Sequence, residues 1–511
     1  MHCYDKDYSV FSILPPFNTV HAQVVRVGST SSTPLLCGSS EVSVFYAGVA
    51  DPSRSINTTS IGKTNFWAYC MKIYGAQPAV DVGLLGSTMP GRANTPRPMT
   101  IDNVTKWATA RGIPITCIDD GGKFNPYPMM QFQAIPAGST SVIATVDAVV
   151  PVSNEMDCKA CHANGGIAAD QAHAQFYGLQ LSANADPNIA ARENILRLHD
   201  IQYKTQLWAA RPVLCAACHY SPALDLAGTG PGGTQIGHEY MSHAMHRRHG
   251  KTMDNQLPST SNPAIVSSPG VDACYKCHPG NSTNCLRSVM AASGLACQSC
   301  HGDLLAVGAQ YKFRTPWADE PKCQSCHTGD FNSNLGGSLP RMLAYNAGDN
   351  TATPILAPSS RFAETFNTLY RNSSGHGGLA CSACHGSPHT EWPSTNPQAN
   401  DNITSNQLQG HAGPVVECSV CHGMSQASTM SGPHGMHNVN SPTWVSEHHD
   451  LINSYGLASC KACHGTSLQG TYLSKTPVAR TFPPHDGRAM NIAAGTAVSC
   501  GQCHQNPING Y

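Results

Sequence analysis

The chain has 511 residues, enough for two or three domains, and its formal net charge of −1 gives no argument for a nucleic-acid partner. It contains no apolar run near the length of about 18 residues that a membrane-spanning helix needs, so none is expected. Its 23 cysteines and 25 histidines exceed what a thiol enzyme needs, and disulfide-rich scaffolds are usually short chains.

We expect residues 1–152, which precede the first repeated motif, to form a small β-sandwich with short helices. One segment, EVSVFYAG, alternates apolar and polar residues with period two, as a half-buried strand does, and three others have a strand-like composition. Turn residues separate them, as in an all-β domain. The four expected strands are 21–27, 41–48, 129–134 and 141–150.

Two short helices are expected to interrupt these strands. The first covers 65–75 after Thr64, and the second covers 103–112 after Asp102. Each follows a residue that can cap a helix and each ends at a glycine, which is the usual pattern of helix start and stop signals. The chain opens with MHCYDKDY, which lacks the basic and apolar regions of a signal peptide. A signal is therefore expected to have been removed, or the sequence is that of the mature form.

From residue 158 onward the chain repeats Cys-x-x-Cys-His nine times, which uses 18 of the 23 cysteines. Two thiols three residues apart lie on one side of a turn and can form thioethers with both vinyl groups of a haem, and the next imidazole then faces the iron. We predict nine covalently bound haem c groups. The attachment cysteines are Cys158, Cys161, Cys215, Cys218, Cys274, Cys277, Cys297, Cys300, Cys323, Cys326, Cys381, Cys384, Cys418, Cys421, Cys460, Cys463, Cys500 and Cys503. The proximal ligands are His162, His219, His278, His301, His327, His385, His422, His464 and His504.

Zinc and disulfide exchange are the alternatives for this motif. Structural zinc takes four protein ligands, usually from two Cys-x-x-Cys pairs or from one pair and a distant histidine pair. Nine pairs that each carry an adjacent histidine fit that arrangement poorly. A thioredoxin-like redox motif normally occurs once, after a strand.

The histidines outside the motifs are numerous enough to give every iron a second imidazole. Sixteen lie outside, and only His2 and His21 of these precede the first motif. An iron with two axial imidazoles has no coordination position left for a substrate. A methionine ligand would raise the reduction potential of the haem, so histidine at both axial positions indicates electron transfer at low potential. A His/Met pair at one site is the alternative. The expected distal ligands are His199, His246, His249, His376, His389, His411, His434, His437 and His448, with His173, His238, His243, His449 and His485 as reserves.

Three of these candidates, His199, His246 and His249, lie on expected helices. In DPNIAARENILRLHDIQYK, Asp186 can cap a helix with Pro187 at its first position, which places His199 on one face with Leu196 and Tyr203. A buried histidine that serves only the fold is the alternative there. In AMHRRHG, two histidines lie one helical turn apart and can reach two neighbouring haems.

The segment 373–389, SSGHGGLACSACHGSPH, holds the sixth motif and two further histidines. The iron bound by His385 has room for one more imidazole, so His376 and His389 cannot both serve it. At least one of them is expected to reach a neighbouring haem, which makes the segment a junction between cofactors.

Residues 153–511 are expected to be a loop-rich region, mainly irregular and α-helical. They provide about 40 residues per motif, which is too little for an ordinary apolar core around each, so the porphyrins are expected to form the core. Five cysteines remain outside the motifs: Cys3, Cys37, Cys70, Cys117 and Cys285. Haem attachment implies an oxidising compartment, so we expect at least one disulfide among them; buried free thiols are the alternative.

These residues resemble the large multihaem c-type cytochromes of metal-reducing bacteria. The resemblance covers about 153–511 and is carried by the nine motifs and by GHGGLACSACHGSPH, LQGHAGPVVECSVCHG and GPHGMH; the opening segment MHCYDKDYSVFSILPPFNTVHAQVV is similar but less specific. It implies bis-histidine haems stacked in a continuous chain, and export to the cell surface or the extracellular space. It also implies electron delivery to other cytochromes or to extracellular acceptors such as metal oxides, electrodes or other cells. Some similar proteins polymerise with a histidine of one subunit on a haem of the next, so a homopolymer is a further hypothesis.

Three classes of function remain open. The leading interpretation is an electron conduit rather than an enzyme, at the cell surface or as a filament subunit, with a soluble periplasmic shuttle as its variant. A reductase of nitrogen or sulfur oxyanions would need one iron with an open position. A structural or adhesive protein would leave nine haems without a role.

Overall fold

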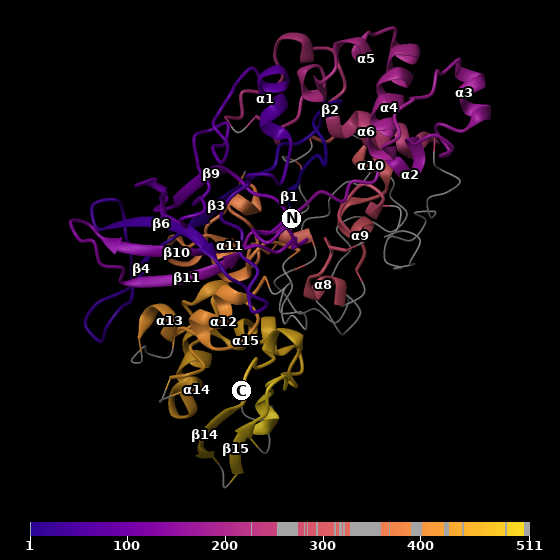
Figure 1. Ribbon diagram of the computed structural model, residues 1–511. Coiled ribbons are helices and arrows are strands. Elements are labelled where there is room, and N and C mark those ends of the chain that lie inside the picture. Colours follow the sequence, from indigo (N-terminus) through magenta and orange to yellow (C-terminus); the bar gives the residue numbers. More distant parts are fainter. Residues whose placement is uncertain are drawn as a thin grey trace.

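The computed structural model (Figure 1) is a mixed α/β structure with a β-rich N-terminal region. It describes residues 2–225, 227–252, 274–280, 282–283, 285–292, 295–310, 313–315, 319, 322–325, 327, 359–366, 368–389, 401–423, 429–441, 444–485 and 488–504. No helix among these residues is both long enough and apolar enough to cross a membrane.

Two antiparallel sheets dominate the N-terminal region. One has the strand order β11-β10-β6-β7 and the other the order β3-β9-β8. Side chains of both sheets share one buried core, in which Val44 and Phe132 of the first sheet join Ala110 and Ile113 of the second. The strands are β1 (His2–Cys3), β2 (Phe11–Ser12), β3 (Phe17–Ala22), β4 (Val25–Arg26), β5 (Leu35–Leu36), β6 (Val42–Val49), β7 (Arg97–Pro98), β8 (Thr100–Ile101), β9 (Ala108–Pro114), β10 (Met129–Pro136), β11 (Ala144–Val149) and β12 (Val152–Ser153).

The later region consists of short helices joined by loops, as Figure 1 shows. Its α-helices are α2 (Lys159–His162), α3 (Gln171–Tyr177), α4 (Pro187–Tyr203), α5 (Leu207–Ala210), α6 (Met241–Thr252), α8 (Val289–Ala292), α9 (Cys297–His301), α10 (Leu304–Val307), α11 (Cys381–His385), α12 (Ile403–Gln409), α13 (Ser419–His422), α14 (Trp444–Tyr455) and α15 (Leu457–His464). Its 3₁₀ turns are η1 (Cys215–Ala217), η2 (Gly233–Gln235), η3 (Cys323–Ser325), η5 (Tyr370–Asn372), η6 (His376–Gly378), η8 (Pro433–Gly435), η9 (Tyr472–Ser474) and η10 (Cys500–Gln502). Its strands are β13 (Val213–Leu214), β14 (Arg480–His485) and β15 (Arg488–Ile492).

The expected strands over 41–48, 129–134 and 141–150 are confirmed by β6, β10 and β11, while 21–27 contains the end of β3 and all of β4. The first expected helix is α1 (Phe66–Tyr74), which ends at a left-handed glycine, Gly75. Both helices with named histidines, α4 and α6, are also present, and Asp186 caps α4 by accepting a hydrogen bond from the Asn188 backbone.

The helix expected over 103–112 is wrong, because the second half of this stretch is the start of β9. Asp102 accepts hydrogen bonds from the backbones of Val104 and Thr105, as a helix cap would, but the chain then turns and pairs with β3. Strand pairing buries Ala108 and Ala110 in the core between the sheets. This burial outweighs the local preference for a helix.

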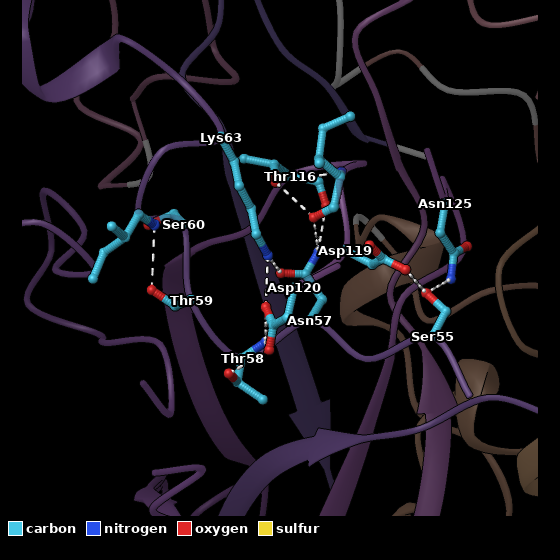
Figure 2. A network of polar contacts seen from close by, with 12 residues as sticks. Ser55, Asn57, Thr58, Thr59, Ser60, Lys63, Thr116, Asp119, Asp120 and Asn125 are labelled. Carbon is cyan, nitrogen blue, oxygen red and sulfur yellow. Dashed lines mark hydrogen bonds and ion pairs between the residues drawn. The ribbon is translucent and has the colours of Figure 1, made fainter. Parts of the chain in front are cut away.

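A polar network fixes the loop after β6 to the segment that follows β9 (Figure 2). The Lys63 ammonium donates to Asp120 at 2.7 Å and to the Asn57 side-chain oxygen at 3.0 Å. The Asn57 amide in turn donates to the Thr116 carbonyl at 2.6 Å, and the Thr58 hydroxyl donates to Asp120. Burial lowers the pKa of Lys63. The network thus gives hydrogen-bond partners to polar groups of both loops.

The N-terminal segment, which contains β1, Asp5 and β2, contacts the later region of the chain as well as the β-rich region. β1 pairs in parallel with β12, and β2 pairs in parallel with β13. Asp5, whose side chain is fully buried, accepts a hydrogen bond from the Arg192 guanidinium of α4 at 3.0 Å. These contacts join the chain on both sides of residue 153.

The expected disulfide is wrong for this structure, in which all five cysteines outside the motifs are free thiols. Cys37, Cys70 and Cys117 are buried among apolar side chains in the β-rich region. Each therefore fills space in a core as a small hydrophobic residue.

Candidate functional site

Each Cys-x-x-Cys-His motif begins as a single helical turn. The backbone N–H of the motif histidine donates to the carbonyl of the first cysteine at 2.8–3.0 Å in the first, second, third, fifth, seventh and ninth motifs. The fourth, sixth and eighth motifs lie in α9, α11 and α15. Because residues i, i+3 and i+4 share one face of such a turn, both thiols and the imidazole lie on the same side in the eight motifs whose two cysteines are described. Cys326, of the fifth motif, lies outside the described residues.

Eight of the nine motif histidines lie beside a histidine from outside the motifs. A metal–imidazole bond is about 2 Å long and a ring centre lies about 1 Å behind its nitrogen, so an iron between two imidazoles sets the ring centres roughly 6 Å apart. The pairs, with the distances between ring centres, are His162 and His249 (6.3 Å), His219 and His199 (6.3 Å), His278 and His246 (6.0 Å), His301 and His389 (6.3 Å), His385 and His434 (5.8 Å), His422 and His376 (5.9 Å), His464 and His437 (6.3 Å), and His504 and His448 (5.6 Å). The spacing of the rings at eight motifs therefore matches that of an axial pair of ligands; in the last pair the Nε2 atoms of His448 and His504 lie 3.3 Å apart.

Hydrogen bonds at Nδ1 set the tautomer of several of these imidazoles. A carbonyl oxygen only accepts, so an Nδ1 that bonds one must carry the hydrogen, and its Nε2 then presents a lone pair. Such bonds, at 2.7–2.9 Å, are made by His246 to Ser242, by His249 to Met245, by His434 to Arg361, by His448 to Trp444, by His464 to Val498 and by His219 to Glu239. This is the arrangement in which a protein carbonyl orients a metal-binding histidine.

Burial keeps many of the paired imidazoles neutral, which is the form that binds a metal. It lowers the pKa of the first motif's His162 to about 4, and that of His246, which lies beside the third motif's His278, also to about 4. It lowers the pKa of His389 and His437 further, to about 3. At neutral pH these side chains are therefore uncharged.

Helix α6 connects the first and third motifs. His249 faces the first motif's His162, and His246, one turn earlier, faces the third motif's His278. The sequence predicted that these two histidines reach two different sites, and the structure places them so.

The segment 373–389 connects the sixth motif with two others. His376 lies beside His422 of the seventh motif, and His389 lies beside His301 of the fourth. The partner of the sixth motif's own His385 comes from elsewhere in the chain. Both flanking histidines therefore reach other motifs, whereas the sequence required this of only one.

Further short segments connect the remaining motifs. His434 and His437 lie three residues apart beside the sixth and eighth motifs. Trp444 stacks on His437 at 3.7 Å between ring centres and lies 5.6 Å from His448, the candidate for the ninth motif. Helix α4 carries His199, beside the second motif, and its Asn194 donates to the carbonyl of the first motif's His162.

His411, an expected distal ligand, makes no ring contact with a motif histidine within the part of the chain that the structure describes. Its Nε2 is 3.2 Å from a Glu417 oxygen and its Nδ1 is 2.8 Å from the Ala412 carbonyl oxygen, so both nitrogens have protein partners. Glu417 also accepts from Arg480 at 2.6 Å. The structure thus places both nitrogens of His411 in a polar network with Glu417 and the Ala412 carbonyl.

Of the reserve histidines whose side chains are described, one lies beside a motif histidine and three have other contacts. His238 lies 6.0 Å from the second motif's His219, so that motif has two neighbouring candidates. His243 is buried and its Nε2 bonds the Arg314 carbonyl. His173 packs on Tyr177, and His449 lies 3.0 Å from Asp450. The side chain of His485 lies outside the described residues.

The fifth motif differs from the others. Its His327 has Phe362 at 5.9 Å between ring centres, and Phe362 also lies 4.9 Å from His434. The sequence analysis did not select Phe362, and no motif or spacing marks it. Only the tertiary structure brings it to this histidine.

The described residues contain no group of three or more His, Cys, Asp or Glu side chains arranged to hold a metal ion. Pairs of imidazoles are what a haem iron needs, because the porphyrin supplies its other four ligands, whereas structural zinc takes four from the protein. No family model matches the chain, and neither a curated protein nor a solved structure matches it.

Proposed function

We propose that the protein is a multihaem c-type cytochrome that transfers electrons through nine covalently bound haems. The observation that carries the proposal is the pairing of eight motif histidines with eight others at 5.6–6.3 Å between ring centres. A disulfide or zinc function of the motifs would not require these pairs. Haem supplies reversible one-electron chemistry at iron, and the chain's residues hold and orient it.

The contacts between motifs support a continuous path for electrons. α4 connects the second and first motifs, and α6 connects the first and third. Arg314 connects the third and fourth, because it receives the hydrogen bond of His243 on α6 and donates to the His301 carbonyl at 2.8 Å. The segment 373–389 then connects the fourth motif with the sixth and seventh, and 434–437 connects the sixth with the eighth. The sixth motif therefore has several neighbours, which favours a branched array over a single file.

Haem content and redox titration test this proposal. Intact-mass measurement and a pyridine haemochrome assay of the exported protein should both give nine haems per chain. Potentiometry should give low potentials, as expected for pairs of imidazoles. Protein that matures without haem, or that binds zinc at the motifs, would contradict the proposal.

We further propose export and electron delivery to other cytochromes or to extracellular acceptors, as the resemblance to multihaem cytochromes implies. The β-rich region suits docking or assembly. Stopped-flow oxidation of the reduced protein by ferric citrate and by ferric oxide particles tests delivery, and electron micrographs at several concentrations test polymerisation. Monodisperse particles at every concentration would exclude a filament and leave a shuttle.

A further inference from the structure

The segment 23–36 of the β-rich region, which contains β4 and β5, contacts both sides of the seventh site. That site pairs His422 with His376, at 5.9 Å between ring centres. Gln23 binds the turn that carries His376, and Gly28 binds the residue that precedes His422. The two histidines are far apart in sequence, so contacts with a third segment can fix one relative to the other.

The turn that carries His376 is short and closed by its own hydrogen bonds. The Gly375 backbone donates to the Leu379 carbonyl at 2.8 Å, which encloses His376 in five residues. The Cys381 backbone donates to the Ser373 carbonyl at 3.0 Å, which ties the turn to the start of the sixth motif. A displacement of this turn would therefore carry the His376 imidazole with it.

The side-chain amide of Gln23 joins this turn to the β-rich region. Its Nε2 donates to the carbonyls of Gly378 and Thr105, at 3.2 Å in each case, and its Oε1 accepts from the Ala380 backbone at 2.9 Å. Both hydrogens and the oxygen of the amide are thus in use, which fixes its orientation. Because Thr105 lies between β8 and β9, the amide ties the turn to a sheet of the N-terminal region.

Close packing on two glycines accompanies these bonds. Gly378 has a φ of +82°, and a β-carbon there would lie 3.2 Å from the Leu36 side chain. The Gly28 backbone donates to the Cys421 carbonyl at 2.8 Å, and a β-carbon at Gly423, whose φ is +69°, would lie 3.1 Å from the Gly28 oxygen. Glycine permits both the positive φ and the close approach. The segment 23–36 therefore packs on the distal and the proximal side of one site.

We propose that Gln23 is a positioning residue for the seventh haem, where it holds His376 at the iron opposite His422. The inference rests on the proposed haem content. Groups that hold a metal-binding histidine in place contribute to how firmly the metal is bound. An external ligand can enter at a six-coordinate iron only after one imidazole has left, so the hold on the turn sets how fast the seventh haem takes up carbon monoxide.

Stopped-flow uptake of carbon monoxide by the reduced protein, with nine haems verified by mass, tests the proposal. His376→Ala opens the seventh iron and thereby identifies the kinetic phase that belongs to it. Gln23→Leu removes both hydrogen bonds to the turn and should raise the rate of that phase about tenfold or more. The phases of the other haems should keep their wild-type rates.

Two further variants separate positioning from a general loss of structure. Gln23→Glu keeps an acceptor for the Ala380 backbone but has no hydrogen to donate, so it should give a smaller increase in the rate. Gln133→Leu is the matched control, because it makes the same exchange on β10 and loses a bond to Gln131. It should leave every phase unchanged.

The results separate this inference from the proposed function. Fewer haems than nine in the wild-type protein would count against the haem assignment itself. Nine haems with an unchanged seventh phase in Gln23→Leu would overturn the inference and leave the electron-transfer proposal intact. Faster uptake at several haems, or an equal effect of Gln133→Leu, would show a general loosening of the fold and would also overturn it.

Discussion

The buried ion pair between Asp5 and Arg192 provides the sharpest test of how the N-terminal segment is joined to the later region. One Asp5 oxygen accepts from Arg192 at 3.0 Å, and the other accepts from the backbones of Ile13 and Leu14 at 2.6 and 2.9 Å. The side chains are 0% and 4% exposed. Arg192 also donates to the Phe11 carbonyl and lies over the Phe11 ring at 4.5 Å.

Asp5→Asn is the informative substitution, because its remaining oxygen can keep the two backbone bonds while the charge is removed. Arg192 is then a buried cation without an anion. Removing one partner of a buried pair costs about 3–5 kcal/mol, which corresponds to roughly a 150-fold to 5,000-fold change in the unfolding equilibrium. Arg192→Met should cost a similar amount, because it leaves the carboxylate buried without its cation.

The double variant Asp5→Asn/Arg192→Met removes both charges and keeps the backbone bonds. It should therefore be more stable than either single variant, by about 2 kcal/mol or more. Urea unfolding followed by tryptophan fluorescence measures this cycle, because Trp208 belongs to the same apolar cluster as Phe11. A loss below about 1 kcal/mol in Asp5→Asn, or additive losses in the double variant, would refute the reasoning.

Four further outcomes are expected. His376→Met should alter only the haem of the seventh motif, and His389→Met only the haem of the fourth. Each variant should show a new His/Met spectrum from one haem in nine. A change confined to the haem of the sixth motif would contradict the pairing. His411→Ala should leave every haem spectrum unchanged, because both of its nitrogens have protein partners; loss of a low-spin haem would show that it is a ligand. Burial raises the pKa of Asp120, but hydrogen bonds from Lys63 and Thr58 outweigh this effect and lower the pKa below the usual 3.8. The ionised Asp120 therefore stabilises the fold above pH 3.8, and this contribution is lost as the pH falls through the lowered pKa. The urea concentration at the unfolding midpoint should thus fall less between pH 5 and pH 3 in Asp120→Asn than in the wild-type protein. An equal fall in both proteins would contradict this role of Asp120. The unfolded, unreduced haem protein should titrate five thiols with a thiol reagent, because the cysteines outside the motifs are free; three or one would reveal disulfides.

Local chemistry made the motifs and several elements predictable. Two cysteines and a histidine at i, i+3 and i+4 need only one helical turn to share a face, so the sequence alone identifies the expected attachment groups. The helix of His199 was predictable for the same reason, because Asp186 and Pro187 act within the first turn. The second predicted helix failed because strand pairing with β3, far away in sequence, decided the conformation of Ala108–Pro114.

The distal side was only partly predictable. The sequence supplied a surplus of histidines, and eight of the nine that we selected lie beside a motif histidine, but the sequence could not say which motif each one faces. His411 looked equivalent to His376 in sequence, yet a carboxylate and a carbonyl occupy its two nitrogens. Nothing in the sequence marked Phe362. Attachment depends on neighbours within one turn, which the sequence lists directly, whereas axial pairing depends on contacts between distant segments, and only the packing of those segments decides them.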